Sequence, residues 1–181
     1  MKLEKIIKSI SYGYSFRGKV EENLTGNVYV LQAKDVQINN LSKELAIKIK
    51  AEEVKEKFIL QDNDILLTSK GRFSACVFQN ISKDTFIASS GLFVIKIRSN
   101  NYIPEYVSLF LNSNKGQYQI NTRLETMTIP SLTKESLLTI EIPDISIEEQ
   151  QKLVNLNKAL FKYEGLVNKK IDLCKKLIGA K

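Results

Sequence analysis

The sequence predicts an α+β domain, built on a mixed or antiparallel sheet, followed by one long C-terminal α-helix. Short runs of β-branched and aromatic residues alternate with polar turns between residues 27 and 98, a pattern that is typical of strands. Helical patterns follow from Pro104 onward, and a heptad pattern extends from Ile147 to Ile178. We therefore divide the chain into a domain at residues 1–145 and a helix at residues 146–181.

Composition favours a globular protein in a reducing compartment. Hydrophobic residues make up 43% of the chain and charged residues 26%, which is ordinary for globular domains. No run reaches the about 18 apolar residues of a membrane span, and the first residues lack the apolar core of a signal peptide. Cys76 and Cys174 are too few for a disulfide framework or a zinc site. We therefore expect a cytoplasmic protein that contacts no membrane.

The formal net charge of +7 makes nucleic acid a candidate partner, although charge alone does not decide this. Residues 146–181 carry +4 of that charge, from eight lysines and four acidic residues, and solvated helices are often lysine-rich. The arginines are more informative, because Arg17, Arg72 and Arg123 lie in polar or glycine-containing stretches that we expect to be loops.

Signals for catalysis are absent from the sequence. The chain has no histidine, which removes Ser-His-Asp and Cys-His catalysis and most zinc sites. Gly13 to Lys19 matches the outline G-x-x-x-x-G-K of a phosphate-binding loop, but Val20 stands where Mg²⁺ needs Ser or Thr, and no apolar strand precedes the loop. We expect a binding protein and not an enzyme, with no cofactor or metal of its own.

The first half of the chain is predicted to open with a helix and to continue as strands. The spacing of Leu3, Ile6, Ile7 and Ile10 predicts a short amphipathic helix that ends near Ser11. Strands are expected at residues 27–33, 46–50 and 92–98, with a polar turn at residues 34–37.

A hairpin with a basic tip is predicted next. Two apolar runs, Ile65–Thr68 and Ala75–Phe78, flank the glycine-containing loop Ser69–Phe73. Lys70 and Arg72 in this loop can reach a phosphate or a base edge. The alternative is an ordinary solvated turn.

Helical signals return after the sheet. Pro104 opens a helix that Asn112–Asn114 ends, and a second helix is expected from Lys115 to about Ile120. Residues 122–128 are polar and irregular in pattern. A short helix or turn is expected around Glu135–Leu137, followed by an alternating strand at Leu138–Ile142.

The C-terminal segment predicts one long helix with an apolar seam. Ser146 and Glu149 form an S-x-x-E capping box at its start. At about 1.5 Å per residue this helix is about 48 Å long, which exceeds the width of a small domain. The seam either packs on its own domain or pairs with a second long helix from another chain. Lys170 interrupts the seam, where it either sets the register of helix pairing or marks the point at which the pairing ends. The seam consists of Leu153, Leu156, Leu160, Tyr163, Val167, Cys174 and Leu177.

In combination, these segments resemble a target-recognition domain, with its following helix, of the specificity subunit of type I restriction-modification systems. The matching pieces occur in the expected order over nearly the whole chain. The most specific are Ile129-Pro-Ser-Leu-Thr-Lys134, Ile142-Pro143 and Glu148-Glu-Gln-Gln-Lys152. The others are Ser11–Lys19, Gln61–Thr68, Ile87–Phe93, Ile103–Tyr106 and Phe110–Ser113.

The resemblance implies double-stranded DNA as a partner, together with the methyltransferase and restriction subunits that a specificity subunit directs to a bipartite site. Those subunits would supply the chemistry, with S-adenosylmethionine, ATP and Mg²⁺. Full-length members carry two domain-plus-helix units whose helices pair antiparallel, and this chain shows one. It therefore resembles a half-subunit that forms a homodimer through its helix and reads an inverted repeat. An alternative is a decoy that binds methyltransferase subunits through its helix without reading DNA.

In such a domain, phosphate contacts position the protein and loop side chains specify the sequence. The principal candidates for phosphates or guanine edges are Arg17, Lys19, Lys70, Arg72 and Arg123. Tyr12, Tyr14 and Phe16 either line the DNA groove or belong to the core. Weaker candidates are Gln32, Lys34, Gln37, Ser89, Ser90, Ser131 and Thr133.

Overall fold

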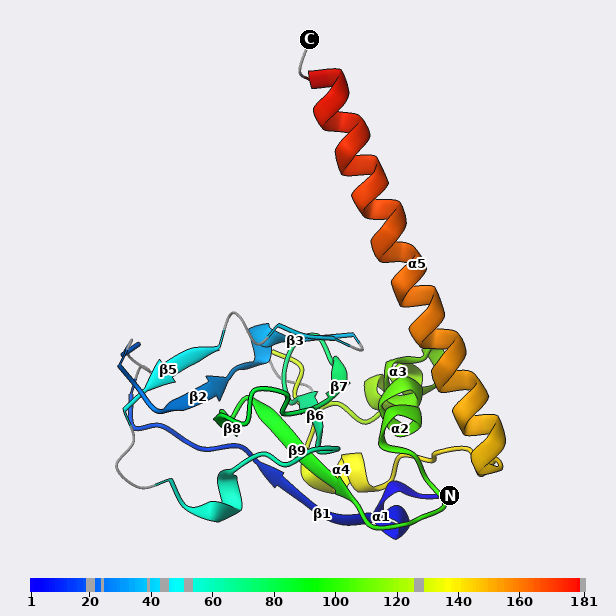
Figure 1. Ribbon diagram of the computed structural model, residues 1–181. Coiled ribbons are helices and arrows are strands. Elements are labelled where there is room, and N and C mark those ends of the chain that lie inside the picture. Colours follow the sequence, from blue (N-terminus) through cyan, green and yellow to red (C-terminus); the bar gives the residue numbers. More distant parts are fainter. Residues whose placement is uncertain are drawn as a thin grey trace. The chain divides into compact units, whose positions relative to one another are not determined.

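The computed structural model describes residues 1–18, 22–23, 25–38, 40–42, 46–50, 54–125 and 129–179 (Figure 1). The chain divides into two compact units, Met1–Asp144 and Ile145–Lys181. The first unit contains the described strands and the shorter helices, and the second consists of the long C-terminal helix. The predicted α+β class with a long final helix is confirmed.

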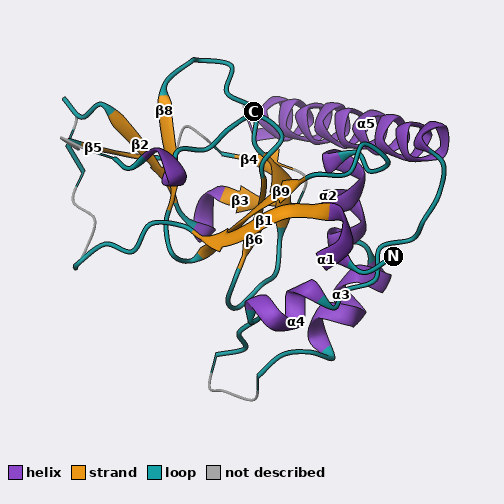
Figure 2. Ribbon diagram, turned by 90° about the horizontal axis from the view of Figure 1, so that it is seen from below, coloured by secondary structure: helices purple, strands orange, loops and turns teal. Residues whose placement is uncertain are grey.

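The described strands of the first unit form three sheets, whose arrangement can be followed in Figure 2. The four-stranded sheet has the order β1-β9-β6-β7 and is antiparallel throughout. In the three-stranded sheet β5-β2-β8, β2 runs antiparallel to β5 and parallel to β8. The third sheet is the antiparallel pair β3-β4. The strands are β1 Ile7–Tyr12, β2 Val28–Leu31, β3 Val36–Gln37, β4 Asn40–Leu41, β5 Ile47–Ile49, β6 Ile65–Thr68, β7 Ala75–Val77, β8 Thr85–Ala88 and β9 Leu92–Ile97.

The helices of the first unit begin at recognisable capping residues. Pro104 is the first residue of α2, where its missing N–H costs nothing. Ser113 caps α3 by accepting from the Gly116 amide, and Thr133 caps α4 by accepting from the Ser136 amide. The helices are α1 Leu3–Ile6, α2 Pro104–Asn112, α3 Asn114–Asn121 and α4 Lys134–Leu138, with 3₁₀ turns η1 Ala33–Asp35 and η3 Glu56–Phe58.

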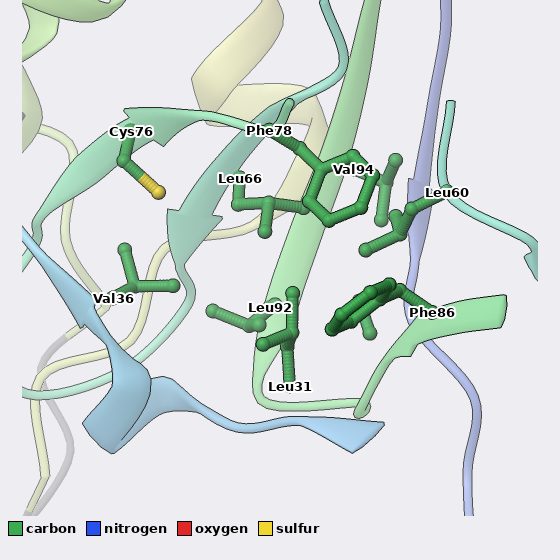
Figure 3. Packing of buried hydrophobic residues seen from close by; sticks show 10 residues of the cluster. Leu31, Val36, Leu60, Leu66, Cys76, Phe78, Phe86, Leu92 and Val94 are labelled. Carbon is green, nitrogen blue, oxygen red and sulfur yellow. The ribbon is translucent and has the colours of Figure 1, made fainter. Parts of the chain in front are cut away.

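A buried apolar cluster lies between the four-stranded and three-stranded sheets (Figure 3). The Phe78 and Phe86 rings meet in it with centroids 5.4 Å apart. Burying a side chain of this size stabilises the fold by about 1.5–3 kcal/mol. The cluster comprises Leu31, Val36, Leu60, Leu66, Cys76, Phe78, Phe86, Ala88, Leu92 and Val94.

The central strand β6 is buried on both faces. Leu66 belongs to the cluster between the sheets. Successive side chains of a strand point to opposite faces, so Ile65 and Leu67, which are also fully buried, point away from it. The second face is covered by α2, which packs on β6 and β7. The four-stranded sheet is therefore covered on both faces where β6 lies.

The predicted N-terminal helix is wrong beyond its first turn. The helix α1 ends at Ile6, and residues 7–12 form β1, which pairs with β9. The register shifts between Ile7 and Ser9, as at a β-bulge. A bulge adds one residue to the strand, so Ile7 and Ile10 are both buried although they lie three residues apart. This spacing imitates a helical pattern.

Two further predictions need correction. The segment 34–37 is not a simple polar turn, because η1 ends at Asp35 and Val36 enters the core as part of β3. The predicted strand Leu138–Ile142 is only half right. Capped by Thr133, α4 continues to Leu138, and the chain is extended only from Ile140, where it pairs with residues 1–3. Part of the predicted irregular segment, residues 126–128, lies outside the described residues.

The second unit is the helix α5, Ile147–Gly179. Its predicted capping box is confirmed: the Glu149 amide donates to Ser146 Oγ at 3.2 Å, and the Ser146 amide donates to Glu149 Oε2 at 3.1 Å. The seam residues are exposed, from 37% at Val167 to 74% at Leu177. No helix in the described part of the chain is both long and apolar enough to span a membrane.

Gly13 follows β1 at a point where there is no room for a side chain. A Cβ placed there would lie 2.3 Å from Ser89 O and 2.4 Å from Ala88 O. The Gly13 amide donates to Leu92 O, and the Tyr14 amide donates to Ala88 O. Packing against the turn after β8 thus accounts for the first glycine of the G-x-x-x-x-G-K pattern.

Gly13→Ala should therefore destabilise the fold by about 1–3 kcal/mol, because two backbone carbonyls must move to admit the methyl group. The midpoint of urea unfolding measures this loss. Gly165→Ala is the matched control, because no atom lies within 4 Å of its added Cβ and alanine favours a helix. Equal destabilisation by the two changes, or none by either, would contradict this account.

Candidate nucleic-acid interface

The β6–β7 loop, Ser69–Ser74, presents two cations on a hydrogen-bonded frame. Thr68 Oγ1 donates to Arg72 O and accepts from the Ser74 amide at 2.9 Å, so the loop closes on itself. Gly71 has φ +72°, in the left-handed region that favours glycine. Lys70 and Arg72 are both exposed. The predicted hairpin with a basic tip is confirmed as a structure.

Two side-chain amides from the helices hold the far end of this loop. Asn112 Nδ2 donates to Ala75 O at 2.8 Å, and the Ala75 amide donates to Asn112 Oδ1 at 2.9 Å. This pairing satisfies the edge of β7 as a neighbouring strand would. Gln117 Nε2 donates to Phe73 O at 3.0 Å and to Leu111 O at 2.7 Å. The loop is therefore anchored on both sides of Ser74.

Three other segments lie against the β6–β7 loop. The Ser69 amide and its hydroxyl both donate to Gly91 O at 3.0 Å, in the β8–β9 turn. The Gly71 amide donates to Pro130 O, and the Leu132 amide donates to Ser69 O. We call the combination of residues 32–37, 69–74, 89–91 and 129–133 the four-loop surface.

The β2–β3 turn is fixed internally by Asp35 and lies beside Gly91 of the four-loop surface. Asp35 is fully buried, and its Oδ2 accepts from the Gln32 amide at 2.8 Å. Burial raises the pKa of this carboxyl, while the Gln32 hydrogen bond and the nearby Lys34 act in the opposite direction. Gly91 lies close by, since a Cβ there would be 3.7 Å from Ala33 Cβ. The turn is thus fixed with Lys34 and Gln37 exposed.

A cavity of about 420 Å³ opens where this turn meets the β6–β7 loop. Val36 and Ile38 supply apolar surface to it. The polar side chains that line it are Lys34, Gln37, Arg72 and Ser74. The sequence suggested the first three as separate candidates, and the fold brings them to one place.

Lys34 and Arg72 form no ion pair within 4 Å with a described carboxylate, although Asp35 acts electrostatically on Lys34. The ion pair between Lys96 Nζ and Asp64 Oδ2, at 2.8 Å, lies away from the cavity lining. Tyr12 has a different environment. Its pKa is raised by burial and then by the charges of Glu135 and Glu125. An anion is therefore favoured near Lys34 and Arg72 and disfavoured near Tyr12.

The aromatic candidates divide between core and surface. Tyr14 is half-buried and packs edge-on against two rings, with its ring centroid 4.8 Å from that of Phe16 and 5.1 Å from that of Phe58. All three rings pack against a small buried cluster of Val28, Val30 and Ile87. Both Tyr14 and Phe16 therefore contribute to packing. Tyr12 is 46% exposed and lies on the Phe93 ring at 4.6 Å.

The remaining candidates differ in how far their side chains are engaged. Arg17 is exposed beside Gly18, and Lys19 lies outside the described residues. Arg123 Nε donates to Thr139 Oγ1 and its Nη1 to Gln119 O, both at 2.8 Å, so this guanidinium ties α3 to the turn after α4. Thr133 serves as a helix cap. The predicted candidates that lie within the four-loop surface are Gln32, Lys34, Gln37, Lys70, Arg72, Ser89, Ser90, Ser131 and Thr133.

The sequence analysis did not identify Ser74, Val36 and Ile38, which complete the cavity. Ser74 follows a loop and precedes an apolar run, which marks a strand start and gives no sign of a binding site. Val36 and Ile38 flank Gln37 with the alternation of a short strand. This alternation was the feature of the sequence from which Val36 and Ile38 could have been predicted to lie beside the Gln37 site.

Comparison with known proteins gives the family. Residues 1–173 match the family described as Type I restriction modification DNA specificity domain. The chain belongs to this family. The resemblance inferred from the sequence motifs is thereby confirmed. A search of curated proteins finds no match.

Solved structures share the fold of this specificity domain. One, from work on complex assembly and conformational transition of the type I R-M system, has TM-score 0.67 and 17% identity over 93% of this chain. The type I S subunit from M. genitalium gives 0.61, with 13% identity over 97%. The HsdS subunit from Thermoanaerobacter tengcongensis gives 0.60, with 14% identity over 93%. The match covers 39%, 42% and 38% of those chains, so this chain spans about two fifths of their length.

Asn112→Ala should destabilise the specificity domain by about 1–3 kcal/mol, because the buried Ala75 amide and carbonyl lose their partner. Chemical denaturation measures the change. Asn121→Ala, at the exposed end of α3, is the control and should leave the midpoint near that of the wild type. Equal midpoints for the two variants would show that the amide pairing does not support β7.

Proposed function

We propose that this specificity domain recognises double-stranded DNA through the four-loop surface. The observation that carries the proposal is the convergence of four segments that are distant in sequence. Hydrogen bonds among three of them hold Lys70 and Arg72, and Lys34 of the fourth lines the same cavity as Arg72. Backbone atoms of these loops largely satisfy one another. Their exposed side chains therefore remain available for phosphates and base edges.

The proposed role is recognition without catalysis. The chain contains no histidine, and the described residues contain no cluster of three His, Cys, Asp or Glu side chains suited to a metal. We propose that methyltransferase and restriction subunits supply the chemistry, and that S-adenosylmethionine, ATP and Mg²⁺ bind to those subunits. The specificity domain would direct them to their target.

The helix α5 is proposed to mediate homodimerisation. A single helix cannot cover its own side chains, and the seam exposes large apolar residues such as Leu156 and Leu160. Their three-four spacing is that of a coiled-coil interface. Two copies paired through α5 would carry two DNA-reading domains, and a twofold assembly would recognise an inverted repeat in two parts.

Recognition of DNA predicts a steep dependence of affinity on salt. If the domain neutralises about four phosphates, the logarithm of its association constant should fall with the logarithm of salt concentration at a slope near −3.6. Fluorescence anisotropy with a labelled random duplex measures this slope. A protein without duplex affinity at low salt would instead fit the alternative role of a decoy that binds methyltransferase subunits through α5.

Pairing through the seam predicts that Leu160→Glu converts the dimer to a monomer, because a charge at an a position in the middle of an apolar interface is strongly destabilising. Sedimentation equilibrium at micromolar concentrations measures the change. Lys162→Glu is the control, since Lys162 lies two residues further on and hence off the seam. The proposal fails if the wild type is a monomer, or if both variants remain dimeric. Leu160 is 54% exposed, so its replacement should not unfold the helix.

A further inference from the structure

The cavity between the β2–β3 turn and the β6–β7 loop has the chemistry of an anion site. Each polar side chain that lines it can donate a hydrogen bond: the Lys34 ammonium, the Arg72 guanidinium, the Gln37 amide and the Ser74 hydroxyl. No acidic side chain occurs among its described lining residues. Two like charges that line one cavity, with no acidic side chain in its described lining, favour an anionic ligand.

Ser74 supplies an independent observation. The residue is only 5% exposed, and it lines the cavity. Its amide donates to Thr68 Oγ1 and its carbonyl accepts from the Thr68 amide. Its hydroxyl, by contrast, has no hydrogen-bond partner among the described residues. The Ser74 hydroxyl lines the cavity, where it can donate a hydrogen bond to an acceptor atom of a ligand.

The apolar part of the lining indicates which anion is bound. Ile38 is 41% exposed, and it lies one residue from Gln37 and close to Val36. A free phosphate ion has nothing to place against such a surface. A nucleotide unit of DNA has a phosphate with a deoxyribose attached, and the sugar offers apolar C–H groups for this contact.

We infer that this cavity holds one backbone phosphodiester of the DNA, with its deoxyribose against Ile38. Arg72 and Lys34 neutralise the same phosphate from opposite loops, and the Ser74 hydroxyl donates to one of its oxygens. The contact sets the register of the domain on the duplex, so that neighbouring loop side chains face the correct bases. This inference rests on the proposed function and assigns the position of one phosphate within it.

Sharing of one phosphate by two cations makes a distinctive prediction for their removal. Lys34→Ala and Arg72→Ala should each weaken binding to a random duplex about tenfold. The double variant should lose clearly less than the about hundredfold product, because both changes affect one contact. Its salt slope should become shallower by about one unit and not by two. Both side chains are exposed, so unfolding midpoints should stay at the wild-type value.

The neutral hydroxyl gives a second, independent measurement. Ser74→Ala should weaken duplex binding about threefold and leave the salt slope unchanged, because no charge is removed. Lys5→Ala is the control for loss of one positive charge. Lys5 lies in α1, at the edge of the domain opposite β3 in Figure 1, and its removal should change affinity less than twofold.

The outcomes separate this inference from the function on which it rests. If the wild type binds no duplex, the proposed function fails and the inference with it. If the wild type binds with a steep salt slope but the Lys34, Arg72 and Ser74 variants keep its affinity, only the phosphate site is overturned. Multiplicative losses in the double variant would likewise overturn the shared contact. Calorimetric binding of inorganic phosphate by a wild type whose variants retain full DNA affinity would assign the cavity to the free ion instead.

Discussion

The burial of β6 on both faces is the constraint from which the rest of the specificity domain follows. One face packs against the apolar cluster between the sheets, and α2 covers the other. A strand held in this way has one register, because a slip of one residue would exchange its two buried faces. The loop that follows Thr68 therefore starts from a fixed point, and the other loops are fixed in relation to it.

Neutral groups hold three of the four loops together, and the Asp35 carboxyl fixes the fourth, the β2–β3 turn. The frame is built from backbone amides, from the hydroxyls of Thr68 and Ser69, and from the side-chain amides of Asn112 and Gln117. Carboxylates in those three loops would have neutralised the lysines and arginines that the proposed DNA recognition uses. Arg123 shows the opposite case, since its hydrogen bonds to α3 and to Thr139 give it a structural task.

The helix α5 is stabilised differently from the domain. Its first turn is stabilised locally by the Ser146 and Glu149 capping box, while its apolar seam needs a partner surface. Leucines exposed to water gain about 1.5–3 kcal/mol each when fully covered. In the proposed dimer, α5 would both space the two domains and supply the free energy that joins them.

The sequence by itself determined the features that depend on near neighbours. Pro104 marked the start of α2, Ser146 and Glu149 marked α5, and the two runs around Lys70 and Arg72 defined a hairpin. The tertiary structure decided what depends on contacts between distant residues. The bulge in β1 gave a strand the residue spacing of a helix. The strand could not be recognised locally, because strand pairing, unlike helix formation, depends on a partner that is remote in sequence. Likewise Lys34, Arg72 and Ser74 share a cavity only because strand pairing and packing bring their loops together. No local sequence pattern predicts that proximity.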